Sequence, residues 1–255
     1  MPRPPELAGP PAAGIAAPEG LRNALRDLGL SNAHLRPVWM NGSGGLTFAI
    51  ASEGADSAAD FYVKWNPSGS SESLPDEAER LRWLRGKHPA PLVVEVIANE
   101  VEQILITQAL PGESAVSQRW DSEPETVLRA LGEGLRHLHD VPLDECPFDW
   151  GVETRMHSVA VGSGRVEPAP PIDKLVLCQG DPCAPNTLLA ADGSFLAHVD
   201  LARLGAADRW ADLAVMSLSL AWNFRVYDES VFWDAYGIEP DPLRIDFYRT
   251  LWSVE

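Results

Sequence analysis

The hydrophobic pattern of the chain changes at Leu110-Pro111-Gly112, and this change constrains the fold more than any other feature. Before it, apolar residues alternate in short segments, which predicts strands; after it, they recur at helical spacing. Proline and glycine interrupt regular structure, so the change marks a boundary. We therefore expect an α+β protein of two lobes, a small N-terminal lobe over residues 1–108 and a larger, mostly helical C-terminal lobe over residues 109–255.

The N-terminal lobe is predicted to contain a five-stranded antiparallel sheet with one helix. The expected strands cover residues 35–40, 46–52, 60–65, 93–98 and 103–108, the helix covers 75–85, and a short helix at 19–28 precedes the sheet. The first two strands flank Asn41-Gly42-Ser43-Gly44-Gly45, which predicts a hairpin with a glycine-rich tip. Prolines punctuate residues 1–20, so we expect a loose lead-in rather than a secretory signal.

The C-terminal lobe begins with the clearest helical pattern in the chain. Residues 124–139 place their apolar side chains on one stripe, and Ser122 is the expected cap of this helix. A weak segment rich in glycine and proline follows at 162–171. Strands are expected at 174–178 and 196–199, and an apolar helix at 210–222.

Composition limits the classes of partner. Twenty basic and thirty-seven acidic residues give a net charge of −17, which opposes binding to nucleic acid or anionic lipid and favours cationic small molecules. A solvated acidic surface kept for solubility explains the charge equally well. No apolar run is long enough to span a membrane. The odd set Cys146, Cys178 and Cys183 matches no disulfide framework, so we expect a reducing, cytoplasmic location.

The segment Gln179 to Asn186 carries the strongest chemical signal. Asp181 and Asn186 lie in one loop after a predicted strand, and Asp200 ends the next strand. Phosphoryl transfer needs a group that accepts or orients the proton of the attacking hydroxyl, together with oxygen ligands for magnesium. Alone, Asp181 would be a common turn residue. Its occurrence together with Asn186 and Asp200 favours a catalytic loop.

A second set of polar residues lies in the N-terminal lobe. Lys64 is placed on a predicted strand, where its ammonium could reach nucleotide phosphates, and Glu77 in the following helix is the natural partner to hold it. Asp76 and Glu79 compete for this role, and an ordinary solvated lysine beside an exposed helix start is the structural alternative. The glycine-rich turn around Ser43 could let backbone N–H groups approach phosphates, although most hairpin tips have no such role.

Other reactive residues are expected to be structural. His137 and His139 are two positions apart on a helix and cannot face the same way, which argues against a metal pair. Cys178 and Cys183 flank the catalytic loop, but no neighbouring histidine or third cysteine in the sequence completes a zinc set. The tryptophans fall at helical positions that are typical of the core.

In this order the motifs resemble those of the aminoglycoside O-phosphotransferases, relatives of the protein kinases that inactivate antibiotics. The similar segments are Tyr62-Val63-Lys64, residues 76–84, Leu138-His139, residues 144–148, 180–186, 199–205 and 207–214. The chain looks most similar to the branch that phosphorylates 3′ or 3″ hydroxyls, which includes the streptomycin 3″-phosphotransferases. The resemblance implies a bilobal, protein-kinase-like fold.

The resemblance also implies roles in the catalytic half of an active site. Asp181 would be the catalytic aspartate, and Asn186 and Asp200 would bind Mg²⁺. Asp208 and Asp212 match acidic positions that mostly brace the active-site loop.

The nucleotide half would lie in the N-terminal lobe. Lys64 paired with Glu77 would clamp the phosphates of ATP or GTP, and Ser43 would belong to the phosphate loop. Gln108 and Ala109 would lie in the linker whose backbone reads the adenine.

Three features depart from the family pattern. Gln179 stands where relatives usually have histidine, Ala202 replaces a glycine, and residues 152–174 are shorter than the usual acceptor segment. Acidic residues near the C-terminus also lack a clear counterpart apart from Glu255.

We therefore expect a phosphotransferase that uses ATP, or GTP in its place, and moves the γ-phosphate to a 3′ or 3″ hydroxyl of a cationic aminoglycoside antibiotic and so confers resistance. The enzyme is expected to act as a monomer or weak dimer. The short acceptor segment leaves open a kinase of another hydroxylated cationic metabolite. Gln179 leaves open a nucleotide-binding module without turnover.

Overall fold

The computed structural model describes residues 9, 11, 14–52, 54, 57–158 and 168–254. The residues outside this description include much of the predicted lead-in, residues 162–167 of the weak segment, and Glu255. The described chain forms two compact units. One comprises the residues up to Arg85 together with Pro91–Leu110, and the other comprises Gly86–Ala90 and the residues from Pro111 onward. The predicted division after residue 108 did not anticipate that the short segment Gly86–Ala90 groups with the C-terminal unit.

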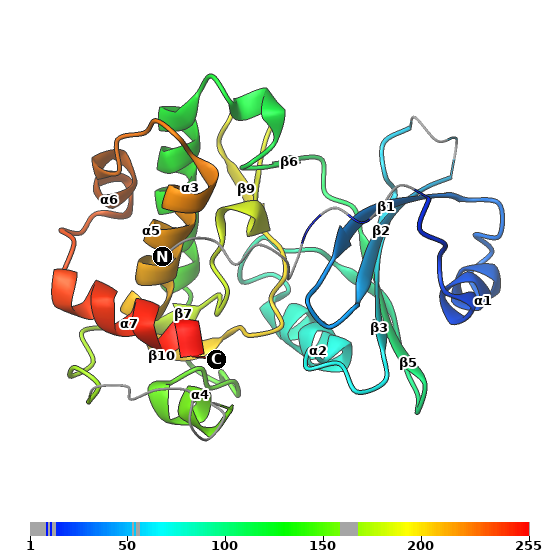
Figure 1. Cartoon of the computed structure of the whole chain (residues 1–255), viewed down its shortest axis with the longest axis horizontal. Helices are drawn as coiled ribbons and strands as arrows, with labels where there is room; N and C mark the ends of the chain where they lie inside the picture. Colours follow the sequence, from blue (N-terminus) through cyan, green and yellow to red (C-terminus); the bar gives the residue numbers. More distant parts are fainter. Residues whose placement is uncertain are drawn as a thin grey trace. The chain divides into compact units, whose positions relative to one another are not determined.

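The N-terminal unit is built on a five-stranded antiparallel sheet, as predicted (Figure 1). Its strand order is β1 (His34–Met40), β2 (Leu46–Ala51), β3 (Phe61–Pro67), β5 (Glu102–Gln108) and β4 (Val93–Ala98). The central strands are rich in β-branched and aromatic residues, which suit a half-buried pleated surface. The sheet thereby provides a rigid base for the side chains of β3.

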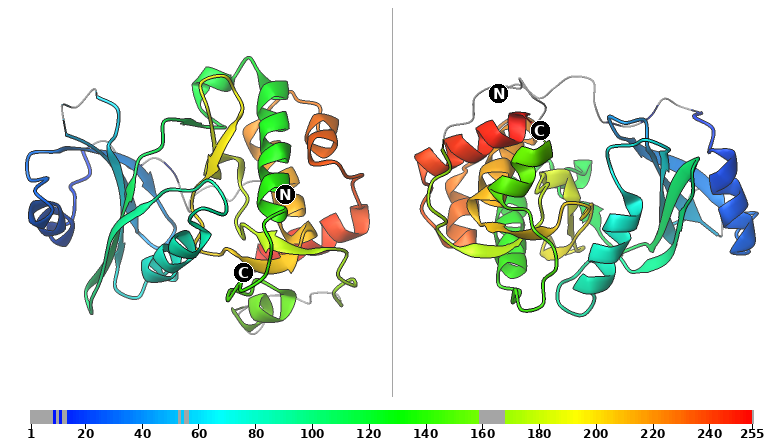
Figure 2. Two further views of the ribbon diagram at one scale, coloured as in Figure 1. Left: turned by 180° about the vertical axis from the view of Figure 1, so that it is seen from behind. Right: turned by 90° about the horizontal axis from the view of Figure 1, so that it is seen from below.

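Two helices cover opposite faces of this sheet, as both views of the unit show (Figure 2). Helix α1 (Glu19–Asp27) packs its buried leucines against Phe48, Val63 and neighbouring apolar residues. Helix α2 (Leu74–Leu84) lies on the other face, and the side chain of Ser73 caps it by accepting a hydrogen bond from the backbone N–H of Asp76. Because successive side chains of a strand point to opposite faces, Val63 faces α1 and Lys64 faces α2.

The C-terminal unit is mostly helical, which confirms the predicted class (Figure 1). Its longer elements are α3 (Pro124–His139), α4 (Val152–Ser158), α5 (Trp210–Asn223), α6 (Ser230–Tyr236) and α7 (Pro242–Val254). Strand β7 (Leu175–Cys178) pairs with β10 (Gly205–Asp208), and β8 (Thr187–Leu189) lies between β6 (Glu113–Ser114) and β9 (Phe195–His198). Short 3₁₀ turns cover Gln118–Trp120 and Ala184–Asn186. Within the described residues, no helix has both the length and the apolar composition needed to cross a membrane.

Local details of the helices differ from the sequence prediction. Helix α3 has Glu123 at its N-cap and no capping side-chain hydrogen bond, so the expected role of Ser122 is wrong. Pro124 explains the start, because the first helical position needs no N–H donor. Helix α4 was not predicted. Close packing of α3 on α6 depends on Gly132, where a Cβ atom would lie 2.6 Å from the Phe232 carbonyl oxygen.

Two buried histidines, His88 and His198, lie against each other in the C-terminal unit. His88 Nε2 and His198 Nδ1 are 3.0 Å apart, and the rings of His137 and Phe195 lie beside that of His88. Burial lowers the pKa of His88 to about 3 and lowers the pKa of His198 well below its usual value, with the neighbouring histidines adding to the effect. Both rings are therefore neutral in the folded protein at neutral pH.

This pair predicts a specific loss of stability in mild acid. Below pH 6.5 the unfolded chain binds protons at His88 and His198, whereas the folded chain does not. The free energy of unfolding therefore keeps the full contribution of this pair above pH 6.5 and falls as the pH drops toward 3. The His88→Gln variant should lower the slope of unfolding free energy against pH by up to about 1.4 kcal/mol per pH unit. Urea unfolding between pH 7.5 and 5 measures this slope. A Gln replacement of the exposed His34 is the control, and equal slopes for His88→Gln and the parent would refute the prediction.

Candidate active site

Lys64 and Glu77 form an ion pair in the N-terminal unit. The Nζ atom of Lys64 lies 2.7 and 2.8 Å from the two carboxylate oxygens of Glu77. Strand β3 presents the lysine, and the first turn of α2 presents the glutamate, whose side chain is 4 % exposed against 26 % for the lysine. A buried carboxylate thus holds an ammonium group that still reaches solvent. The sequence favoured Glu77 over Asp76 and Glu79 as the partner of Lys64, and the structure shows this pair.

The predicted phosphate turn is organised by a residue that the sequence did not single out. Asn41 Oδ1 accepts hydrogen bonds from the backbone N–H groups of Ser43 at 3.1 Å and Gly45 at 2.6 Å. Its amide nitrogen donates to Glu72 at 2.7 Å. The Oγ atoms of Ser43 and Ser71 are 2.9 Å apart. The backbone N–H of Gly44 also donates to the Asn41 carbonyl oxygen at 3.1 Å, so Asn41 engages three of the turn's backbone N–H groups.

Gln108 and Ala109 lie at the end of β5 in the same unit. The backbone N–H of Gln108 donates to the Leu92 carbonyl oxygen, and that of Ala109 donates to the Asp60 carbonyl oxygen, both at 2.9 Å. Neither N–H is available to donate to an adenine ring. A backbone donor for a base in this segment must come from another residue.

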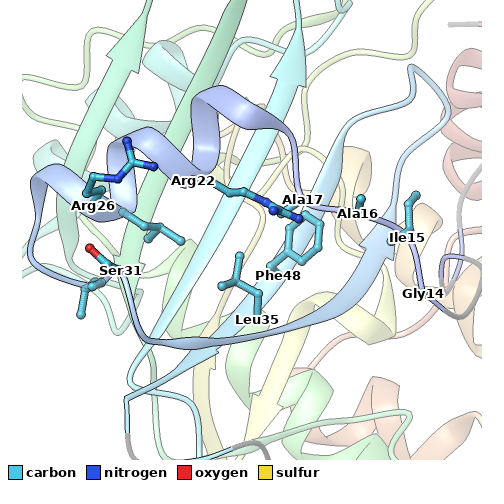
Figure 3. Close-up of a pocket in the computed structure, with 11 residues that line it drawn as sticks. Gly14, Ile15, Ala16, Ala17, Arg22, Arg26, Ser31, Leu35 and Phe48 are labelled. Carbon is cyan, nitrogen blue, oxygen red and sulfur yellow. The ribbon is translucent and has the colours of Figure 1, made fainter.

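A cavity of about 520 Å³ lies on the face of the sheet that α1 covers (Figure 3). It is lined by apolar side chains of α1, β1 and β2, by Gly14–Ala17, and by Arg22 and Arg26. Figure 3 shows the side chains of Arg22 and Arg26 pointing in different directions, so the two guanidinium groups do not converge. Because Phe48 and Lys64 face opposite sides of the sheet, this cavity is separate from the Lys64–Glu77 pair.

In the C-terminal unit, the loop after β7 turns sharply at Gly180. This glycine has a φ of +88°, and a Cβ atom would lie 2.3 Å from the carbonyl oxygen of Arg203. Both the conformation and the space require glycine. The turn brings Asp181 out of the sheet directly after the buried strand.

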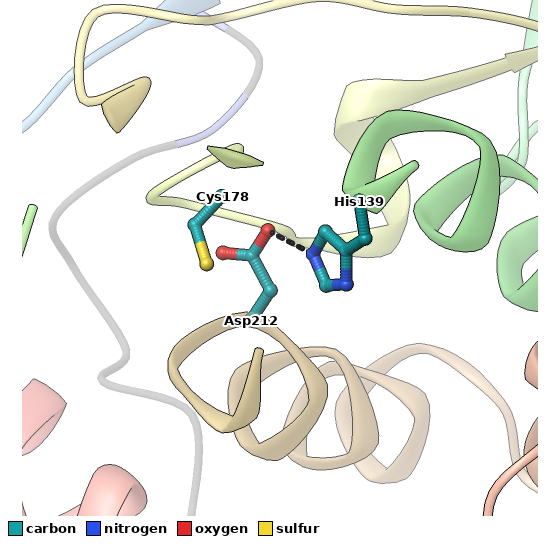
Figure 4. Close-up of side chains that lie close together, drawn as sticks. All are labelled: His139, Cys178 and Asp212. Carbon is teal, nitrogen blue, oxygen red and sulfur yellow. Dashed lines mark hydrogen bonds and ion pairs between the residues drawn. The ribbon is translucent and has the colours of Figure 1, made fainter. Parts of the chain in front are cut away.

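Asp212 anchors this turn from helix α5. Its Oδ2 accepts the backbone N–H of Gln179 at 2.6 Å, and its Oδ1 accepts that of Gly180 at 3.1 Å. His139 Nε2 lies 3.1 Å from Oδ2 (Figure 4), and the Tyr236 hydroxyl lies 2.8 Å from His139 Nδ1. Because the Asp212 carboxylate can only accept, Nε2–H of His139 donates to it. Burial raises the pKa of Tyr236, so its hydroxyl stays protonated beside Nδ1.

The same cluster includes Cys178, which the sequence left without a histidine partner. Its thiol lies with His139 and Asp212 in a group whose possible ligand atoms are within 4.8 Å of one another. Burial raises the pKa of Cys178 well above its usual value, which opposes the thiolate that a metal needs. Both oxygens of Asp212 already accept backbone N–H groups. The cluster therefore braces the loop rather than forming a metal centre.

Asp181 is held in a compact turn. Asn186 Nδ2 donates to the backbone oxygen of Asp181 at 3.0 Å, and the Cys183 thiol donates to its carboxylate Oδ1 at 3.2 Å. Burial and the neighbouring carboxylate raise the pKa of Cys183, so its thiol remains a donor. The two ends of the segment Asp181 to Asn186 are thereby fixed to each other.

Asp200 is joined to this loop through Val199. The backbone N–H of Val199 donates to the Asn186 carbonyl oxygen at 2.9 Å, and Gln179 Nε2 donates to the Val199 carbonyl oxygen at 3.0 Å. Asp200 has a φ of +61°, a left-handed conformation that residues other than glycine seldom adopt. The structure thus links the three residues that the sequence associated.

The donor set of this loop fits a hard divalent cation. The amide nitrogen of Asn186 is engaged by Asp181, which leaves Oδ1 as the end of the side chain that can bind a cation. Asp200 supplies a carboxylate. Carbonyl and carboxylate oxygens are the ligands that Mg²⁺ prefers, so Asn186 and Asp200 could hold this ion.

Several supporting residues were missed by sequence reasoning. Ser219 Oγ accepts the backbone N–H of Ala184 at 2.9 Å, and Ser114 Oγ donates to the Pro185 carbonyl oxygen at 3.0 Å. Ser219 lies two helical turns after Asp212 and so shares its face of α5, a spacing that could have identified it. Ser114 and Tyr236 carry no comparable signal, because they approach from distant parts of the chain.

Comparisons with known proteins concern the family and the fold of the chain. Residues 41–156 match the model of the phosphotransferase enzyme family. A streptomycin 3″-kinase of Streptomyces griseus is 31 % identical over 249 residues, covering 84 % of this chain and 90 % of the relative. The solved aminoglycoside-3′-phosphotransferase of type VIII superposes with a TM-score of 0.77 at 27 % identity, over 93 % of this chain and all of the other. The aminoglycoside phosphotransferase APH(3″)-Id from Streptomyces rimosus, solved with ADP and streptomycin, shares the fold at 23 % identity, with a TM-score of 0.72 over 92 % of this chain and 97 % of the other.

Because Asp212 holds two backbone N–H groups of the loop, a conservative substitution at this position should lower the free energy of unfolding strongly. Replacement of Asp212 by Asn removes the charge that accepts two backbone N–H groups and turns an NH₂ group toward one of its former donors. We expect the free energy of unfolding to fall by about 3 kcal/mol. Chemical denaturation measures this loss. Asp246→Asn, on the exposed side of α7, is the matched control and should change stability by less than about 0.5 kcal/mol. Similar stabilities for the two variants would show that Asp212 does not anchor the loop.

Proposed function

The chain belongs to the aminoglycoside phosphotransferase group of the phosphotransferase enzyme family, and on this premise we propose that it transfers the γ-phosphate of ATP to a 3′ or 3″ hydroxyl of an aminoglycoside antibiotic. Such a transfer would inactivate the antibiotic and confer resistance. The streptomycin 3″-kinase of Streptomyces griseus supports the 3″ position, and the type VIII enzyme supports the 3′ position.

One observation carries the proposal. The loop that bears Asp181 is bonded through Asn186 and Val199 to the residue before Asp200. This connection gives one carboxylate to act on the attacking hydroxyl and two oxygen donors to bind a cation, all from adjoining backbone. A turn with only a structural role would need one polar side chain of this kind, not three.

We assign the proton transfer to Asp181. Its carboxylate accepts the proton of the acceptor hydroxyl while the hydroxyl oxygen forms a bond to the γ-phosphorus, and the bond from that phosphorus to the bridging oxygen of ADP breaks. The proton remains on Asp181 until solvent removes it. Cys183 orients the carboxylate through the hydrogen bond to Oδ1, and Asn186 fixes the backbone beneath it.

In the N-terminal unit, we assign the donor phosphates to Lys64. Glu77 holds the ammonium in place with a bidentate contact, so little side-chain entropy is lost when a phosphate binds. Ser43 offers its hydroxyl from the neighbouring turn. Gln108 and Ala109 remain assigned to the base-binding linker through their carbonyl groups, since their N–H groups are engaged.

Magnesium completes the proposed site. Asn186 and Asp200 would hold the ion, which neutralises charge on the departing diphosphate when bound.

The charge distribution supports a cationic acceptor. Residues 111–255 contain 24 acidic and 11 basic side chains, so this region carries −13 of the net −17. Aminoglycosides are polycations, and a negative field raises their local concentration and association rate. Because salt screens such fields, the apparent affinity for the acceptor should fall with ionic strength.

The decisive assay combines the purified protein with ATP, Mg²⁺ and a panel that includes streptomycin and aminoglycosides with a free 3′ hydroxyl. We expect one of them to gain a single phosphoryl group by mass spectrometry, at a position that phosphorus NMR assigns. Replacement of Asp181 by Asn should lower kcat at least about a hundredfold with the fold retained. Asp192→Asn, in an exposed turn, should retain activity.

The other outcomes separate the alternatives. Phosphorylation of a different amino alcohol with every aminoglycoside refused would indicate another kinase of the same chemistry. Tight nucleotide binding without any product would indicate a binding module, and either result overturns the antibiotic assignment.

The assignment of Lys64 makes a separate prediction. The Lys64→Met variant loses the ammonium that would contact the donor phosphates, so KM for ATP should rise about tenfold to a hundredfold. KM for the acceptor should change less than about threefold. Steady-state kinetics with each substrate varied in turn provides the measurement, and Lys87→Met, at an exposed lysine, is the control. An unchanged KM for ATP together with an unchanged kcat would exclude Lys64 from the nucleotide site.

A further inference from the structure

Gln179 occupies an unusual position in the catalytic loop. Its side chain is completely buried, and its backbone N–H is already fixed by Asp212 at 2.6 Å. The side-chain Nε2 reaches across to the Val199 carbonyl oxygen at 3.0 Å. Gln179 therefore connects the start of the loop that carries Asp181 to the strand that leads into Asp200.

Both polar groups of the Val199 backbone are bound by the loop. Its N–H donates to the carbonyl oxygen of Asn186, at one end of the loop, and its carbonyl oxygen accepts from Gln179, at the other end. The carbonyl belongs to the peptide unit between Val199 and Asp200. Holding this carbonyl restricts rotation of that peptide unit about the N–Cα bond of Asp200, which is the rotation that φ describes.

Asp200 needs such a restraint. Its φ of +61° is a left-handed conformation that places Cβ of a non-glycine residue close to backbone atoms, and a surrounding structure must maintain it. In the absence of the Gln179 contact, the peptide could relax toward a more common φ. The carboxylate of Asp200 would then move relative to Asn186.

The other end of the Gln179 amide gives independent support. Among the described residues, Oε1 has no hydrogen-bond donor although it is buried. A buried acceptor without a partner is unfavourable, and an apolar side chain of similar length would avoid it. The Nε2 group of the amide makes a hydrogen bond, whereas its buried Oε1 atom lowers stability. We therefore infer that the amide has a role besides stability.

We propose that Gln179 is a positioning residue that, through the Val199 carbonyl, holds Asp200 in its left-handed conformation and thereby sets the Mg²⁺ ligand pair Asn186 and Asp200. This inference rests on the proposed function, because it assigns a purpose to the same loop. Groups that orient metal ligands typically change metal affinity or activity tenfold to a hundredfold when removed. Gln179 acts without contact to the nucleotide or acceptor.

The test compares side chains that differ in the donor. Gln179→Met has nearly the same length and no N–H group, whereas Gln179→His retains a ring N–H that can donate to Val199. Gln179→Asn keeps the amide but is one methylene shorter, so it serves if the methionine variant does not fold. Gln118→Met, at an exposed glutamine in the turn Gln118–Trp120, is the matched control.

The readout is the affinity for ADP with and without Mg²⁺, measured by calorimetry on the full chain, together with kcat and the thermal midpoint. For Gln179→Met we expect the gain in ADP affinity that Mg²⁺ provides to fall about tenfold and kcat to fall at least about tenfold. The affinity for ADP without Mg²⁺ and the thermal midpoint should stay close to the parent values. Gln179→His should recover most of the Mg²⁺ effect.

A parental Mg²⁺ effect in both Gln179→Met and Gln179→Asn would overturn the proposal. So would a loss of ADP affinity that is the same with and without Mg²⁺, since that pattern indicates a general structural role. Failure of the proposed function is a distinct result: the parent protein would then phosphorylate no aminoglycoside, while the Mg²⁺ effect on ADP binding would still report on Gln179.

Discussion

The carboxylate of Asp212 is the interaction on which the rest of the candidate site depends. It accepts two successive backbone N–H groups at the start of the catalytic loop and a third hydrogen bond from His139. A fully buried carboxylate is stable only when such donors replace its lost hydration. The turn at Gly180 has no room for a side chain, so the backbone there is closely packed and few conformations are open to it. Asp212 fixes the backbone at the start of this turn. The position of the Asp181 backbone is then set by its peptide bond to Gly180.

Much of this fold follows from local patterns in the sequence. The alternation around Lys64 placed it on the face of the sheet opposite Val63, and helical spacing placed Glu77 in the first turn of α2, where the ion pair is found. The candidate catalytic loop was recognisable because a strand, a turn and three oxygen-bearing side chains occur in a fixed order. Such features depend on neighbours within a few residues, which is why periodicity and turn chemistry predict them.

The features that were missed depend on contacts between distant segments. His88 and His198 pair across 110 positions, and neither residue has a local pattern that indicates burial. The segment Gly86–Ala90 belongs to the C-terminal unit although it lies between α2 and β4 of the sheet. Asn41 was overlooked because the glycines of its turn dominate the sequence signal, while its amide performs the bonding. The failed cap at Ser122 has a different origin, since Pro124 alone is sufficient to start α3.

The hydrogen bonds of the loop also explain why a non-glycine residue can occupy a left-handed conformation at Asp200. In the proposed site a carboxylate at this position binds the cation, which glycine could not do, so the backbone strain must be offset by the surroundings. The bonds to Val199 provide this restraint from two directions, one from Gln179 and one from Asn186. The same two residues are in turn fixed by Asp212 and by the Asp181 backbone. The strained backbone at Asp200 and the braced turn at Asp181 therefore belong to one network of hydrogen bonds, most of them between a side chain and the backbone.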